Sequence, residues 1–110
     1  MLTINDLIEI NKEFDKGKII NKSEIEFAVD AANRSKDWIT QLAYLIRGIV
    51  ADHAFEEGNK RTGAAIMMAY CMAHKKRYDV YKIDRIIRDL AQKKVTDITK
   101  IRRMVKNAII

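Results

Sequence analysis

No proline occurs in this chain of 110 residues, and only four residues are glycine. Sheet-rich domains need turn-forming proline and glycine at short intervals, so this scarcity favours helices. Apolar residues recur at helical spacing along most of the chain, with turn residues between the apolar segments. We therefore expect an all-α protein, a compact bundle of about six helices that forms a single domain over residues 1–110.

Side chains that can cap a helix amino terminus precede five of the predicted helices, and two of them begin capping boxes. The predicted caps are Thr3, Ser23, Ser35 or Asp37, Asp84 and Asp97. Two of the predicted helices, the one that runs into His53 and the one that ends near His74, are apolar over more than one narrow stripe. We expect these two to be central and buried, with a neighbouring helix packed closely against Gly48.

The balance of 48% hydrophobic and 33% charged residues is that of a soluble globular protein. The longest apolar run, residues 64–73, is about half the ~20 residues that a bilayer-spanning helix needs, so we expect no membrane partner. Cys71 is the single cysteine, and the amino terminus lacks a basic-then-apolar signal pattern. Both observations favour a cytoplasmic protein with Cys71 buried.

The net charge of +6 is unevenly distributed along the chain. From Lys75 onward there are twelve lysines and arginines against four acidic residues, whereas the first 74 residues carry nine against eleven. A basic final third is compatible with nucleic acid, a phosphorylated ligand, an acidic partner or simply a solvated helix face.

Residues 53–63, HAFEEGNKRTG, concentrate the chemically active side chains between the two central helices. His53 lies at the end of a predicted helix, where an imidazole that titrates near neutrality can act as a general base. Glu57 is close in sequence and can bind a hard cation such as Mg²⁺.

The second half of this stretch has the composition of an anion site. Gly58 allows close approach of the backbone, and Asn59 stands where the next helix begins, with its N–H groups available. Lys60 and Arg61 add positive charge where the helix dipole prefers negative charge, which implies an anion between them. Residue types alone leave a second interpretation open, that of a capped corner between two helices.

The order of these residues resembles the H-x-F-x-[D/E]-G-N-x-R signature of the Fic/Doc (Fido) family. The six matching positions are His53, Phe55, Glu57, Gly58, Asn59 and Arg61. The resemblance implies the Fido fold, with the motif loop between two central buried helices. It extends over essentially the whole chain in size and helical character, although only the motif is specific.

The resemblance also implies roles for these residues, with ATP and Mg²⁺ as cofactors. His53 would be the catalytic base that deprotonates a hydroxyl of a target protein, and Glu57 would bind the Mg²⁺. The nucleotide phosphates would be held by Gly58, Asn59, Lys60 and Arg61. Phe55 would point into the core and hold the loop.

Two positions distinguish between subfamilies. AMP-transferring Fic enzymes usually have glycine where this chain has Lys60 and a second arginine where it has Ala64. The chain instead resembles Doc, the death-on-curing toxin, in which ATP binds the other way round and the γ-phosphoryl group is transferred. We predict a Doc-like kinase toxin, with protein AMP transfer as the alternative. A basic nucleic-acid-binding module and an inactive Fido binding domain are further alternatives.

The resemblance implies two protein partners. The target would be a translation factor such as elongation factor Tu, and an antitoxin would inhibit the enzyme in trans. No serine or threonine is followed four residues later by glutamate, so the inhibitory pattern common in Fic proteins is missing from the sequence. We accordingly expect exposed apolar surface near the first two helices, where an antitoxin would dock. Nucleic acid is not an expected partner of the enzyme.

Overall fold

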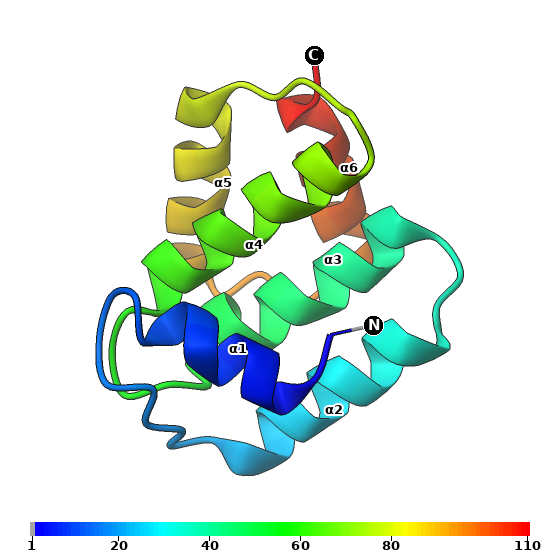
Figure 1. Cartoon of the computed structure of the whole chain (residues 1–110). Helices are drawn as coiled ribbons and strands as arrows, with labels where there is room; N and C mark the ends of the chain where they lie inside the picture. Colours follow the sequence, from blue (N-terminus) through cyan, green and yellow to red (C-terminus); the bar gives the residue numbers. More distant parts are fainter. Residues whose placement is uncertain (1) are drawn as a thin grey trace.

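The computed structural model describes residues 2–110, and these residues form six α-helices and one π-helical turn (Figure 1). Two isolated β-bridges are the only strand-like pairs within this range. The elements are α1 (Ile4–Asn11), α2 (Lys22–Arg34), α3 (Trp38–Ile46), η1 (Arg47–Ala51), α4 (Asn59–Ala73), α5 (Val80–Lys93) and α6 (Ile98–Ala108). The prediction of an all-α bundle of about six helices is confirmed.

The α3–η1 segment and α4 lie side by side through the middle of the molecule, with α1 and α2 on one side and α5 and α6 on the other (Figure 1). Leu42, Ile46 and Ile49 from the first segment and Ile66 and Met67 from α4 are all buried in one hydrophobic core. The predicted pair of central buried helices is therefore present. Within residues 2–110, no helix combines the length and apolarity needed to cross a membrane.

Glycines allow the central helices to pack closely against their neighbours. A Cβ atom on Gly63 of α4 would lie 2.5 Å from Cγ2 of Val50, and one on Gly48 would lie 2.6 Å from Cβ of Ala28. Both distances are shorter than carbon atoms tolerate. The predicted close approach at Gly48 is confirmed, and α2 is the helix that approaches it.

Three of the predicted caps are confirmed. Thr3 and Asp6 form a reciprocal capping box at the start of α1. Asp37 accepts a hydrogen bond from the backbone N–H of Thr40 at the start of α3, and Asp97 does the same for Thr99 in α6. These motifs depend on residues within one turn of each other, which explains why sequence alone identifies them.

Two predicted caps are wrong. α2 begins before Ser23, with Asn21 as the N-cap residue, because the preceding segment leaves its β-bridge just ahead of that point. α5 begins after Asp79, whose carboxylate accepts from two backbone N–H groups of the first turn. Asp84 instead lies within α5 and forms an ion pair with Arg88.

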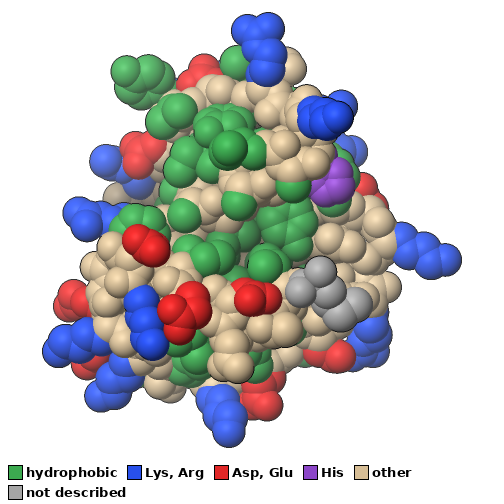
Figure 2. All heavy atoms as spheres, in the orientation of Figure 1, with side chains coloured by type: hydrophobic (Ala, Val, Ile, Leu, Met, Phe, Trp, Pro, Cys, Tyr) green, Lys and Arg blue, Asp and Glu red, His purple; other side chains and the backbone are tan. Residues whose placement is uncertain are grey.

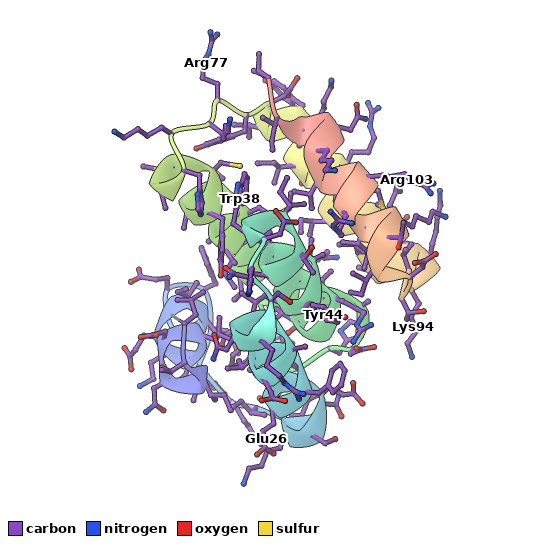
Figure 3. All side chains as sticks on the ribbon, turned by 90° about the vertical axis from the view of Figure 1, so that its right-hand side faces the viewer. Glu26, Trp38, Tyr44, Arg77, Lys94 and Arg103 are labelled. Carbon is purple, nitrogen blue, oxygen red and sulfur yellow. The ribbon has the colours of Figure 1, made fainter. Side chains whose placement is uncertain are left out.

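Most basic side chains of residues 75–110 form no ion pair with a carboxylate. Two of the acidic residues in this range cap helices, and the other two, Asp84 and Asp89, pair with Arg88 and Lys93. Arg77, Lys94 and Arg103 point away from the body of the molecule (Figure 3). α6 carries four basic residues and no acidic one, so its surface is a region of concentrated positive charge.

Candidate active site

The loop that connects η1 to α4 is held by the loop between α1 and α2, which runs beside it (Figure 1). Ile19 and Phe55 form an antiparallel bridge. The N–H of Ile20 donates to the carbonyl of Ala54 at 2.8 Å, and the N–H of Glu56 donates to the carbonyl of Lys18 at 2.9 Å. Phe55 itself is buried in the core, as predicted for a residue that anchors the loop.

The side chain of Asn59 closes this loop from within. Its Oδ1 accepts from the N–H of Phe55 at 2.9 Å, and its Nδ2 donates to the carbonyl of Phe55 at 2.8 Å. Asn59 is only 6% exposed. Its side chain thus stabilises the loop, and its backbone N–H is the group that it can offer to an anion at the start of α4.

A second asparagine, which the sequence did not single out, joins α1 to the same loop. Asn11 is buried, and its Nδ2 donates to the carbonyl of Glu57 at 2.9 Å and to Oγ1 of Thr62 at 3.1 Å. Its Oδ1 accepts from the N–H of Gly17 at 2.8 Å. One side chain therefore positions the end of α1, the motif loop and the first turn of α4.

His53 is exposed and has a left-handed backbone conformation, with φ at +49°. The turn is fixed by Asn21, whose Nδ2 donates to the carbonyls of Asp52 at 2.9 Å and of His53 at 2.7 Å. Left-handed backbone is uncommon for residues with a side chain and recurs at functional sites, where the surrounding structure holds it. The Nδ1 atom of His53 lies 3.4 Å from Nδ2 of Asn59.

Gly58 marks the start of α4 and fits its position for two reasons. Its φ is +76°, and a Cβ atom there would lie 3.0 Å from Nδ2 of Asn11. As N-cap residue it supplies no side chain to the free N–H groups of the first turn. Lys60 and Arg61 follow in that turn and are exposed.

The predicted site residues meet at a cavity of about 510 Å³ beside the amino terminus of α4. The predicted residues that line it are His53, Glu57, Gly58, Asn59, Lys60 and Arg61. Asp15, Glu56 and Ala91 line it as well. Asp15 and Ala91 belong to distant parts of the sequence, and Glu56 lies within the motif stretch at a position that the motif leaves unspecified. An imidazole, three carboxylates and two cations thus surround one open space at the end of a helix.

A family model described as the Fic/DOC family matches residues 2–71. The chain belongs to the Fic/DOC family. The match includes α1, α2, α3, η1, the whole motif loop and most of α4. Comparison with curated proteins and with solved structures gives no match.

One carboxylate of this Fic/DOC site, that of Glu57, could hold a metal ion. Within residues 2–110 there is no group of three or more His, Cys, Asp and Glu residues that could enclose a metal. Mg²⁺ is usually bound through one or two carboxylates together with substrate phosphates and water, not in a cage of protein ligands. Glu57, which lines the cavity, fits binding of Mg²⁺ through one carboxylate together with substrate phosphates and water.

One carboxylate next to the Fic/DOC motif has an altered affinity for protons. Burial raises the pKa of Asp52, and repulsion from Glu24 of α2 raises it further. Asp52 immediately precedes His53, and its backbone carbonyl accepts from Asn21 in the turn that carries the imidazole.

Proposed function

We propose that this Fic/DOC-family protein is a Doc-like kinase toxin, which transfers the γ-phosphoryl group of ATP to a hydroxyl of a target protein. The observation that best supports the proposal is the convergence of His53, Glu57, Lys60 and Arg61 on one cavity at the start of α4. Free N–H groups and the positive end of the helix dipole favour phosphate at this point.

The residues around the cavity would act mainly by positioning charge. His53 accepts the proton of the target hydroxyl, whose oxygen attacks the γ-phosphorus while ADP leaves. Lys60, Arg61 and the first N–H groups of α4 neutralise the phosphate oxygens. Glu57 would hold Mg²⁺, and the ion would neutralise further negative charge of the nucleotide.

The contact between His53 and Asn59 limits which form of the imidazole can react. Oδ1 of Asn59 accepts from Phe55, so Nδ2 is the atom that faces Nδ1 of His53. An N–H donor that faces Nδ1 favours the tautomer in which the imidazole proton is on Nε2. A base that acts through Nε2 needs the other tautomer, with Nε2 unprotonated. We expect the 3.4 Å contact to open in the reacting complex, which the exposure of His53 permits.

Transfer of the γ-phosphoryl group is favoured over AMP transfer by the first two turns of α4. Lys60 lines the cavity where AMP-transferring Fic enzymes usually have glycine, and Ala64 offers no guanidinium from the next turn. The orientation of ATP that exposes its α-phosphorus relies on that second arginine. Protein AMP transfer is accordingly the second candidate.

The resemblance to Doc points to a translation factor such as elongation factor Tu as the target protein. Fic proteins dock their targets on an extended segment before the motif helices, and residues 17–21 are the candidate for that segment in this chain. Here its backbone pairs with the motif loop, and the side chain of Ile20 is 52% exposed next to the site. This arrangement supports a target that is held alongside the cavity.

An apolar groove supports the second partner, an antitoxin that inhibits in trans. A cavity of about 470 Å³ lies between α1 and α4, where Ile10, Ile66 and Tyr70 are among its lining residues. Figure 2 shows the hydrophobic side chains that gather over α4 and toward α1 on this face. An amphipathic helix of the antitoxin would cover this surface.

Incubation with a cell extract, Mg²⁺ and ATP labelled either at the α- or at the γ-phosphorus tests the proposal. We expect the γ label, and not the α label, to appear on a protein of the extract. Transfer of the α label would show AMP transfer and overturn the kinase assignment. Absence of both labels would favour an inactive binding domain or a nucleic-acid-binding module.

A variant in which His53 is replaced tests the proposed base. His53→Ala should abolish transfer while the far-ultraviolet circular dichroism spectrum is unchanged, because the side chain is exposed. Transfer at the wild-type rate would exclude His53 as the base.

A further inference from the structure

A second cavity adjoins the candidate active site and shares two residues with it. This cavity, of about 380 Å³, lies between α4 and α5. Lys60 and Arg61 line both cavities, so the first turn of α4 stands between them. On the far side, α5 contributes Arg88 and Gln92.

The charges around this second cavity favour an anion. Lys60, Arg61 and Arg88 provide three cations, and Asp84 is the one carboxylate that lines it. Nε of Arg88 lies 3.0 Å from Oδ2 of Asp84, which leaves the two terminal nitrogens of the guanidinium for other acceptors. The side chains of Arg88 and Asp84 are 66% and 61% exposed, so their pairing is weak and the guanidinium can turn toward a ligand.

The position of Arg88 complements the small side chain at Ala64. Ala64 lies one turn after Lys60 and lines the same cavity as Arg88. The methyl group of Ala64 occupies little of this cavity, and the guanidinium of Arg88 lines the cavity from the opposite helix. α5 lies outside residues 2–71, so the family match does not assign this contribution.

We propose that the cavity between α4 and α5 is a second phosphate subsite, in which Arg88 binds the phosphates of the nucleotide that are not transferred. The inference rests on the proposed function, because it needs a nucleotide whose phosphate chain passes Lys60 and Arg61. It adds a residue outside the motif, Arg88 of α5, to the groups that hold the phosphate chain.

Equilibrium binding of ATP with Mg²⁺ to the full chain tests the subsite, with Arg88→Gln as the main variant. Arg85→Gln is the matched control, because it removes the same charge from the exposed side of the same helix without lining either cavity. Loss of a charge-assisted hydrogen bond should weaken ATP binding roughly tenfold in Arg88→Gln. Arg85→Gln should bind ATP as the wild type does, and equal weakening in both variants would overturn the proposal.

Competition with inorganic tripolyphosphate shows which part of the nucleotide is contacted. We expect Arg88→Gln to weaken the binding of tripolyphosphate by the same factor as the binding of ATP. If the binding of ATP is weakened and that of tripolyphosphate is not, Arg88 contacts the nucleoside and the proposal of a phosphate subsite is wrong.

A rescue experiment tests whether an arginine on α4 can replace Arg88 in the same cavity. Ala64→Arg in the Arg88→Gln background should recover most of the lost affinity, because both positions face the same cavity. No recovery, in a double variant whose circular dichroism spectrum matches that of the wild type, would contradict a shared subsite.

Failure of the subsite and failure of the proposed function give different results. If the wild type binds ATP and His53→Ala abolishes transfer while Arg88→Gln binds normally, only the subsite is excluded. If the wild type binds no ATP, both are excluded.

Discussion

The backbone of His53 is in a conformation that a β-carbon disfavours, with φ at +49°. His53→Ala and His53→Gly both remove the proposed base, but only glycine relieves the backbone. We expect the glycine variant to be more stable than the alanine variant by about 1 kcal/mol, as measured by urea unfolding. Neither variant should transfer phosphate. A glycine variant that is no more stable would indicate that the turn carries no strain.

Asn59 provides a second test at the scale of one residue. Asn59→Ala leaves the N–H and the carbonyl of Phe55 without their partners inside the loop. Each unpaired buried group costs about 1–3 kcal/mol, so the free energy of unfolding should fall by at least that amount and phosphate transfer should be lost. Asn107→Ala, at an exposed position of α6, is the control and should change neither. Equal unfolding midpoints for the two variants would contradict this role.

Asp52 makes stability depend on pH in a direction that can be worked out. Because its pKa is raised in the folded state, the ionised carboxylate is less favourable in the folded protein than in the unfolded chain. Asp52→Asn should therefore raise the free energy of unfolding at neutral pH. The gain should shrink as the pH is lowered through the folded pKa of Asp52 and vanish below its ordinary value of 3.8. A gain that is independent of pH, measured by denaturant unfolding, would exclude this cause.

At the scale of helices, α4 depends on the fit of Gly63 against η1. Alanine normally stabilises a helix relative to glycine, but a Cβ atom here would lie 2.5 Å from Cγ2 of Val50. We expect Gly63→Ala to lower the free energy of unfolding by about 1–3 kcal/mol. Val50→Ala should compensate in part, so that the double variant is more stable than the sum of the single changes predicts. If the changes in the free energy of unfolding are simply additive, the Cβ atom at position 63 does not clash with Val50.

The helices that sequence predicted well are those whose signals are local. Thr3, Asp37 and Asp97 cap within one turn, and each helix begins where expected. The predicted start of α5 is wrong because two aspartates precede its apolar residues, and Asp79, not Asp84, is the one that caps the first turn. Asp79 also makes a long-range contact, the bond from its N–H to the carbonyl of Ala108 at 2.9 Å. No nearby residue reveals that bond.

The same distinction holds for the candidate site. The motif from His53 to Arg61 is contiguous, so its residues could be named in advance and were found around one cavity. Asn11 contacts the loop across 46 positions of sequence, and Arg88 reaches its cavity from a different helix. Such partners become visible only when the fold is known, because single-sequence patterns carry no information on tertiary neighbours.

At the scale of the whole molecule, the positive surface of α6 should make the protein bind polyanions. Among residues 2–110, no carboxylate lies within ion-pair distance of Lys100, Arg103 or Lys106. Changing all three to glutamine should lower the salt concentration needed to elute the protein from heparin.

The control for this prediction removes three lysines that already have a partner. Lys12, Lys18 and Lys93 each lie within 4.0 Å of a carboxylate. Their change to glutamine alters the net charge equally but should shift elution much less. Equal shifts would mean that heparin senses total charge and not the surface of α6.

The segment between α1 and α2 has a consequence for how the protein can be inactivated. It pairs with the motif loop through Lys18, Ile19 and Ile20, and it contains no residue proposed to react. A protease that cut this segment would leave His53 and Glu57 chemically intact but would release the loop that orients them. A single cut there could thus inactivate the protein while every side chain that lines the candidate site stays unchanged.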